Sequence, residues 1–234
     1  MRSERGGPGP DRLVLVAGTG TGVGKTWVAS RLIEELRAGG AVVAARKPAQ
    51  SAAPDDDPAR RDADVLARAS GEPPDEVCPP ARSYEVAMAP PMAADVLGRP
   101  AFTVADLVTE ISWPAAWVES ARGPRVGLVE TAGGVRSPQA TDGDVLDLVR
   151  HLRPDLVVLV ADAGLGAINA VRLSADALTG PGGLAPERLV VVVNRFDPDD
   201  DLHRRNRSWL STRAGLTLFA TPGDEMRLAA RLVG

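Results

Sequence analysis

Lysine and cysteine are scarce in this sequence of 234 residues. Among its 27 basic residues only Lys25 and Lys47 are lysine, and the remainder are arginine. In a chain that uses arginine almost everywhere, the two surviving lysines indicate positions that need a compact ammonium group. The single cysteine, Cys78, has no partner for an internal disulfide. This favours a reducing, cytoplasmic location.

Other shortages exclude several classes of protein. Aromatic residues make up 3% of the chain and the net charge is -4, so neither a base-stacking platform nor a basic surface for nucleic acid is expected. Apolar runs stay well below the roughly 18 residues of a membrane span. The segment MRSERGGPGP lacks the apolar region of a signal peptide. We therefore expect a disordered tail over residues 1–11 and one domain over residues 12–234, with no membrane partner.

The apolar residues gather in short runs that alternate with amphipathic segments. Continuous runs predict strands buried on both faces, namely Leu13–Ala17, Ala41–Ala45, Val126–Val129, Leu156–Ala161, Leu189–Val193 and Leu216–Ala220. Helical spacing predicts helices between them, namely Lys25–Arg37, Val104–Ile111, Asp144–Leu152, Ile168–Leu178 and Leu202–Arg213. Segments rich in Pro and Gly predict loops at Ser51–Pro58, Glu72–Pro80 and Gly180–Pro186. This alternation predicts an α/β fold with a mostly parallel, doubly wound sheet flanked by helices.

The strongest motif is GTGTGVGKT, Gly18–Thr26, between the first strand and the first helix. Such a loop wraps backbone N–H groups around phosphate oxygens, its lysine reaches the outer phosphates, and its threonine hydroxyl binds Mg²⁺. Five residues, not the usual four, separate Gly18 from Gly24. The motif predicts a P-loop domain that binds a nucleoside triphosphate with magnesium.

Further polar residues follow the other predicted strands, at the edge of the sheet where ligands bind. Lys47 follows the second strand and Glu130 ends the third, so we expect both at the phosphate site. Glu130 is a candidate magnesium ligand, because magnesium prefers oxygen. Asp64, taken alone, is compatible with a solvated or helix-capping aspartate. We expect Lys47 to be essential for turnover and replaceable with little loss of stability.

These motifs occur in a specific order. GTGTGVGKT, RKPAQS, VETAGG, GLGAIN and a strand ending in Asn194 resemble dethiobiotin synthetases, from about Leu13 to about Pro222. The resemblance implies a single P-loop NTPase domain that works as a homodimer. It also implies the reaction, in which 7,8-diaminononanoate captures CO₂ as a carbamate. ATP phosphorylates the carbamate, and the second amine closes the ring to give dethiobiotin, ADP and phosphate.

The resemblance also assigns residues to the site. It makes Lys25 and Lys47 catalytic, and Thr26, Asp64 and Glu130 the magnesium ligands. It implies nucleotide contacts from Thr21, Gly22, Val23, Gly24, Lys25, Thr26, Trp27, Asp64, Glu130, Thr131, Ala132, Gly133, Asn194, Arg195, Thr221, Pro222 and Gly223. It implies substrate contacts from Ser51, Gly166 and Asn169, the last two supplied by the neighbouring subunit.

The chain departs from this family at several positions. Thr131 replaces a glycine, Ala170 replaces a histidine, and Arg195 replaces an aspartate. An alternative is a GTP-binding switch or metallochaperone-type GTPase, because Glu130–Gly133 and Asn194–Asp197 resemble the DxxG and guanine-reading motifs of such proteins. That alternative gives no role to Lys47–Ser51. A partition-type ATPase is a third possibility, which would need a basic surface or an amphipathic terminal helix.

Overall fold

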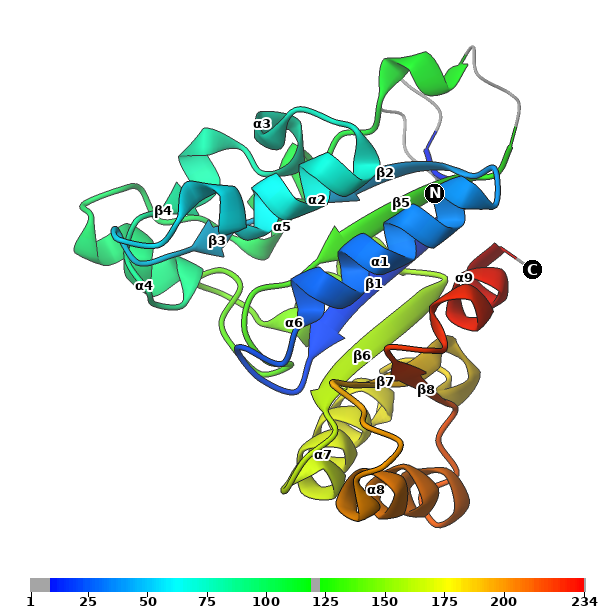
Figure 1. The fold of residues 1–234 in the computed structure, drawn as a ribbon. Helices are drawn as coiled ribbons and strands as arrows, with labels where there is room; N and C mark the ends of the chain where they lie inside the picture. The colour runs from blue at the N-terminus through cyan, green and yellow to red at the C-terminus, as the bar shows by residue number, and fades with distance from the viewer. Residues whose placement is uncertain (1–8, 119–122, 234) are drawn as a thin grey trace.

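The computed structural model of the chain describes residues 9–118 and 123–233. In these residues, six parallel strands form one sheet in the order β2-β5-β1-β6-β7-β8 (Figure 1). The strands are β1 (Arg12–Gly18), β2 (Val42–Arg46), β5 (Arg125–Glu130), β6 (Leu156–Asp162), β7 (Leu189–Asn194) and β8 (Leu218–Thr221). The predicted fold class and all six predicted strands are confirmed, with small shifts at their ends.

Helices cover both faces of this sheet. They are α1 (Lys25–Ala38), α2 (Asp62–Ser70), α3 (Pro74–Val77), α4 (Pro90–Val96), α5 (Val104–Glu110), α6 (Val145–Leu152), α7 (Ala167–Thr179), α8 (Asp201–Thr212) and α9 (Glu225–Val233). The helices α1, α2 and α9 pack against the face that carries Val14 and Val16. The helices α5, α6 and α7 pack against the face that carries Leu15 and Ala17. The strand β1 is therefore an interior strand of the sheet, buried between two apolar cores.

Several elements lie outside the predicted pattern. The strands β3 (Gln50–Ser51) and β4 (Ser83–Tyr84) pair in a small second sheet, and each is too short to show a period. The helix α3 lies inside the segment Glu72–Pro80, which was predicted to be a loop. The helices α2, α4 and α9 have no counterpart among the predicted helices. The β3–β4 pair matters because it anchors the segment that carries Ser51.

The amino-terminal segment is described only in part. Most of the predicted tail, residues 1–8, lies outside the described residues. At its described end, Asp11 pairs with Arg125 and continues the backbone ladder of β1. The division at residue 11 therefore stays a prediction. Within the described part of the chain, no helix has the length and apolar character needed to cross a membrane.

Because the strands are parallel, their carboxyl ends lie along one edge. The register pairs Val16 of β1 with Glu130 of β5, and Asp162 of β6 with Asn194 of β7. The loop that follows β1 is flanked by the ends of β5 and β6, since β1 lies between those strands. Polar residues that are more than a hundred positions apart in the sequence meet at this edge.

Candidate active site

The phosphate loop runs from the end of β1 at Gly18 to the start of α1 at Lys25. Gly24 has φ 92°, and a Cβ atom there would lie 2.0 Å from Nδ2 of Asn194, so only glycine fits. The Lys25 side chain runs back over Gly18, and its Nζ donates a hydrogen bond to the Gly20 carbonyl at 3.0 Å. The loop therefore already has the curved form that surrounds a phosphate, with the lysine folded along it.

The charge on Lys25 is poorly stabilised in the free protein. Burial and the nearby positive charge of Lys47 lower the pKa of Lys25 to about 8, against the opposing effects of Glu130 and Asp62. A phosphate group would remove this disadvantage by giving the ammonium a direct anionic partner. The electrostatics of Lys25 therefore favour an anionic ligand beside it.

A compact cluster of four side chains lies beside this loop. Nζ of Lys47 is 2.7 Å from Oε1 of Glu130 and 2.7 Å from Oδ2 of Asp62, and it also donates to the Thr131 carbonyl at 3.2 Å. The Thr26 hydroxyl lies 2.6 Å from Oδ1 of Asp62 and 2.9 Å from Oε1 of Glu130. Residues from α1, α2, β5 and the end of β2 thus converge on one point.

Burial makes the cluster tightly coupled. Lys47 is 1% exposed and Glu130 is 0% exposed. Burial raises the pKa of Glu130, and Lys47 opposes that effect. Burial alone would lower the pKa of Lys47, but Asp62 and Glu130 raise it above the ordinary value. Removal of the Lys47 ammonium would leave a carboxylate in the core, so this burial argues against the expectation that Lys47 can be replaced with little loss of stability.

The donor set at this point fits a magnesium ion. One hydroxyl hydrogen of Thr26 faces oxygens of two carboxylates, and it can serve only one of them at a time. Oε2 of Glu130 is buried without any hydrogen-bond partner among the described residues. These atoms are all oxygens, which Mg²⁺ prefers, and a cation would satisfy the unpaired ones.

The aspartate in this cluster is Asp62, and the choice of Asp64 from the sequence needs correction. Asp62 is the first residue of α2, and its carboxylate contacts both Thr26 and Lys47. Asp64 follows two positions later on the same helix. At 3.6 residues per turn, two positions correspond to a rotation of roughly 200°, which points Asp64 away from the cluster. Burial alone would raise the pKa of Asp62, but Lys47 and Thr26 hold it below its ordinary value.

Gln50 was not among the predicted site residues, yet it fixes the position of Asp62. Its Oε1 accepts a hydrogen bond from the Ala63 N–H at 2.9 Å, and its Nε2 donates to Oγ of Ser83 at 3.0 Å. The first of these hydrogen bonds satisfies a backbone N–H group at the start of α2 that has no partner within the helix. Gln50 belongs to the RKPAQS motif, so its proximity to Lys47 in the sequence was an available signal.

The ends of β7 and β8 contact the phosphate loop from the other side. Nδ2 of Asn194 donates to the Val23 carbonyl at 2.9 Å, and Oδ1 of Asn194 accepts from the Thr221 hydroxyl at 3.0 Å. Arg195 donates to the Gly22 carbonyl at 2.7 Å. Pro222 and Gly223 form the exposed turn after β8. The predicted nucleotide residues Asn194 and Arg195 thus contact the phosphate loop directly, and Thr221 is linked to it through Asn194.

Other predicted residues lie further from this cluster or are already engaged. The Ala132 N–H donates to the Gln139 side chain at 3.0 Å, which occupies a group expected to face the nucleotide. Gly133 adopts φ 63° beside Ser137. Trp27 is largely exposed on α1, and Thr21 lies at the exposed tip of the loop. Gly166 and Asn169 are exposed at the start of α7.

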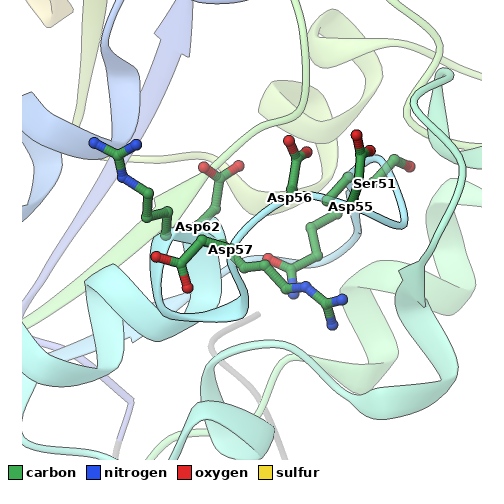
Figure 2. Close-up of a pocket in the computed structure, with 9 residues that line it drawn as sticks. Ser51, Asp55, Asp56, Asp57 and Asp62 are labelled. Carbon is green, nitrogen blue, oxygen red and sulfur yellow. The ribbon is translucent and has the colours of Figure 1, made fainter.

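A cavity of about 550 Å³ opens next to the cluster (Figure 2). Its walls carry four aspartates, two arginines and the small sheet residues, namely Gln50, Ser51, Ala52, Asp55, Asp56, Asp57, Arg60, Arg61 and Asp62. Asp62 belongs to both the cavity and the Lys47 cluster. Oγ of Ser51 is buried without a partner among the described residues.

The fold and this site define a P-loop domain that binds a nucleoside triphosphate at the carboxyl edge of its sheet. A family model described as an AAA domain matches residues 12–221. The chain is 36% identical over 207 residues to the ATP-dependent dethiobiotin synthetase BioD of Haloferax mediterranei, covering 88% of this chain and 82% of that protein. It is 38% identical over 193 residues to the protein of that name from Caulobacter vibrioides, covering 80% and 83%.

A third relative extends the match. The ATP-dependent dethiobiotin synthetase BioD of Anaeromyxobacter dehalogenans is 36% identical over 227 residues, covering 94% of this chain and 95% of that protein. The chain belongs to the dethiobiotin synthetase family.

Proposed function

We propose that this chain is an ATP-dependent dethiobiotin synthetase that carboxylates 7,8-diaminononanoate and closes the cyclic urea, with release of ADP and phosphate. The observation that carries the proposal is the buried Lys47–Glu130–Asp62–Thr26 cluster beside the phosphate loop. The names of the relatives support the same reaction, and with it the use of ATP.

The two lysines have distinct roles in this proposal. Lys25 exchanges its bond to the Gly20 carbonyl for the outer phosphates of ATP. Lys47 lies deeper, where its ammonium neutralises the carbamate oxygen that attacks the phosphorus atom. Phosphoryl transfer depends on positioning and charge neutralisation more than on covalent help. A compact ammonium suits both tasks, in keeping with the retention of lysine at these two positions alone.

Thr26, Asp62 and Glu130 are the proposed residues for magnesium. Their oxygen atoms already face one another, and one Glu130 oxygen has no other partner among the described residues. When bound there, magnesium would neutralise phosphate charge. Asn194, Arg195 and the Thr221–Gly223 turn contact or adjoin the phosphate loop on the side away from Lys47, so we propose that the nucleoside lies there.

The cavity beside Asp62 suits the diamine end of the substrate. Asp55, Asp56 and Asp57 give its rim a negative charge that attracts a protonated amine (Figure 2). Ser51 lines the same cavity, in keeping with the substrate contact that the resemblance implies. An amine in this cavity is adjacent to Lys47 through the shared Asp62.

The other end of the substrate reaches Gly166 and Asn169 of a second copy of the chain. We infer a homodimer because this segment is exposed at the start of α7, and the neighbouring Leu165 is 94% exposed. Leu173 of α7 is also 63% exposed, and two large apolar side chains open to water suit a surface that a partner covers. A cytoplasmic location and the absence of a nucleic-acid partner belong to the same proposal.

A GTP-binding switch is not favoured. The relatives are named as synthetases, and the Lys47 cluster has a role in carbamate phosphorylation that a switch would not need. The deciding experiment measures ADP release with ATP, bicarbonate and diaminononanoate, and again with each omitted. We expect turnover and formation of dethiobiotin only with the complete set. Turnover that is indifferent to the diamine would reject the synthetase proposal.

A further inference from the structure

Two neighbouring residues at the end of β7 hold two neighbouring carbonyls of the phosphate loop. Asn194 donates to the Val23 carbonyl at 2.9 Å, and Arg195 donates to the Gly22 carbonyl at 2.7 Å. Asn194 is buried and bonded on both sides of its amide, whereas the Arg195 side chain is 58% exposed. Arg195 is therefore not needed to fill a core, and its contact calls for a different explanation.

The planarity of the peptide bond gives that explanation. In a trans peptide, the carbonyl of one residue and the N–H of the next point in opposite directions. A donor that holds the Gly22 carbonyl outward therefore turns the Val23 N–H toward the concave side of the loop. The bond from Asn194 to the Val23 carbonyl does the same for the Gly24 N–H. These N–H groups are the ones that a loop of this kind offers to phosphate.

The backbone of Arg195 is strained, and side-chain contacts maintain its conformation. Arg195 has φ 57°, and among the described residues only Arg153 shares this left-handed conformation without being glycine. Its guanidinium also contacts Oδ2 of Asp162 at 2.6 Å. The other oxygen of Asp162 accepts from the Gly164 N–H at 3.0 Å, which fixes the carboxylate. A strained backbone that is maintained by side-chain contacts at a binding site suggests a functional reason for the strain.

We propose that Arg195, oriented by Asp162, is a positioning residue that turns the Val23 N–H toward the nucleotide phosphates. It touches neither the base nor the reacting atoms. The inference rests on the proposed binding of phosphates by Gly18–Thr26. It assigns to Arg195 a task that differs from direct contact with the nucleotide, the role that the resemblance gave it.

Glycine at position 195 provides the sharpest test. The Arg195→Gly variant removes the guanidinium and relieves the backbone strain, so the free protein keeps or gains thermal stability. Titration calorimetry with MgADP should nevertheless show a dissociation constant about tenfold higher than that of the wild type, as expected for loss of a hydrogen bond from a charged group. The KM for ATP should rise by a similar factor, with kcat changed less than threefold.

Three further variants separate positioning from a general structural effect. Arg153→Gly relieves the same kind of strain at the end of α6, and it should leave MgADP affinity unchanged. Arg195→Lys keeps a cation that can reach one of its two partners, so it should restore part of the affinity. Asp162→Asn should weaken MgADP binding a few-fold when it is the only change. In a double variant with Arg195→Gly it should have no further effect, since Asp162 acts through Arg195.

The outcomes are decisive in both directions. A dissociation constant of the Arg195→Gly variant within twofold of the wild type would overturn the inference, as would additive effects of the Asp162 and Arg195 changes. If the glycine variant unfolds, Arg195→Lys and Asp162→Asn decide on the same criteria. Lys25→Ala tests the premise separately, because normal MgADP binding by that variant would reject the phosphate-loop site itself.

Discussion

The Lys47→Ala variant should lose both turnover and a measurable part of its stability. Lys47 and Glu130 are fully buried and 2.7 Å apart, so removal of the ammonium leaves an unpaired carboxylate in the interior. Breaking a buried pair in this way costs about 3–5 kcal/mol. Asp62 adds little to this figure, because its side chain is 39% exposed and water screens its charge. In a domain of this size, the loss corresponds to a fall in Tm of roughly 6–20 °C.

Urea unfolding of the wild type, Lys47→Ala and the double variant Lys47→Ala with Glu130→Gln tests this reasoning. The second substitution removes the buried charge, so the double variant should recover at least half of the lost free energy of unfolding while remaining inactive. A single variant within about 1 kcal/mol of the wild type would refute the buried ion pair, since surface changes have effects of that size or smaller.

The Lys47→Arg variant tests geometry instead of charge. It keeps a cation in a position that is 1% exposed, where the longer, planar guanidinium has no room. Overpacking should cost about 1–3 kcal/mol, and displacement of the reacting atoms by near 1 Å should lower kcat roughly 100-fold. If Lys47→Arg keeps more than half of wild-type turnover, a role that depends on lysine geometry is wrong.

Three further predictions concern the proposed magnesium ligands, the charge on Lys25 and the oligomeric state. Asp62→Asn should raise the magnesium concentration for half-maximal turnover about tenfold, whereas Asp64→Asn, its matched control on α2, should leave it unchanged. The pKa of Lys25 is lowered to about 8 in the free protein and rises when a phosphate binds, so MgATP affinity should be constant below pH 8 and fall above it. Proton uptake, measured from binding enthalpies in buffers of different ionisation heat, should be absent in Lys25→Ala. Sedimentation should give a dimer at micromolar concentration, and an active monomer would contradict the shared site.

The sequence was most informative where chemistry and local pattern coincide. Continuous valine-rich runs predicted the six strands, because burial on both faces removes polar residues from a strand. The phosphate loop was predictable from its glycines, because a backbone with positive φ, as at Gly24, favours glycine locally. Lys47 was visible through composition alone. In each case the signal lies within a few neighbouring residues.

Contacts between distant side chains and backbone groups left no such signal. The choice between Asp62 and Asp64 depends on where α2 begins, and the ends of helices are the least certain part of any prediction. The Gln139 side chain accepts a hydrogen bond from the Ala132 N–H across seven residues. The loop with Asp55, Asp56 and Asp57 reads only as polar, although it forms a cavity wall beside the cluster.

The ion pairs of Lys47 with Asp62 and Glu130 explain why we expect the metal ion and the nucleotide to bind together. Lys47 bridges Asp62 and Glu130, two of the proposed magnesium ligands, so a metal ion alone would meet an ammonium between its carboxylates. Like charges at such short range oppose binding strongly in a buried site. Phosphates change this balance, because they offer Lys25 and Lys47 new anionic partners and release carboxylate oxygens from the lysine. The same bridge keeps Asp62 deprotonated in the empty enzyme, as its lowered pKa indicates. In the proposed reaction, Lys47 would therefore keep its carboxylate neighbours ready for the metal ion until the nucleotide binds, and would then act on the carbamate.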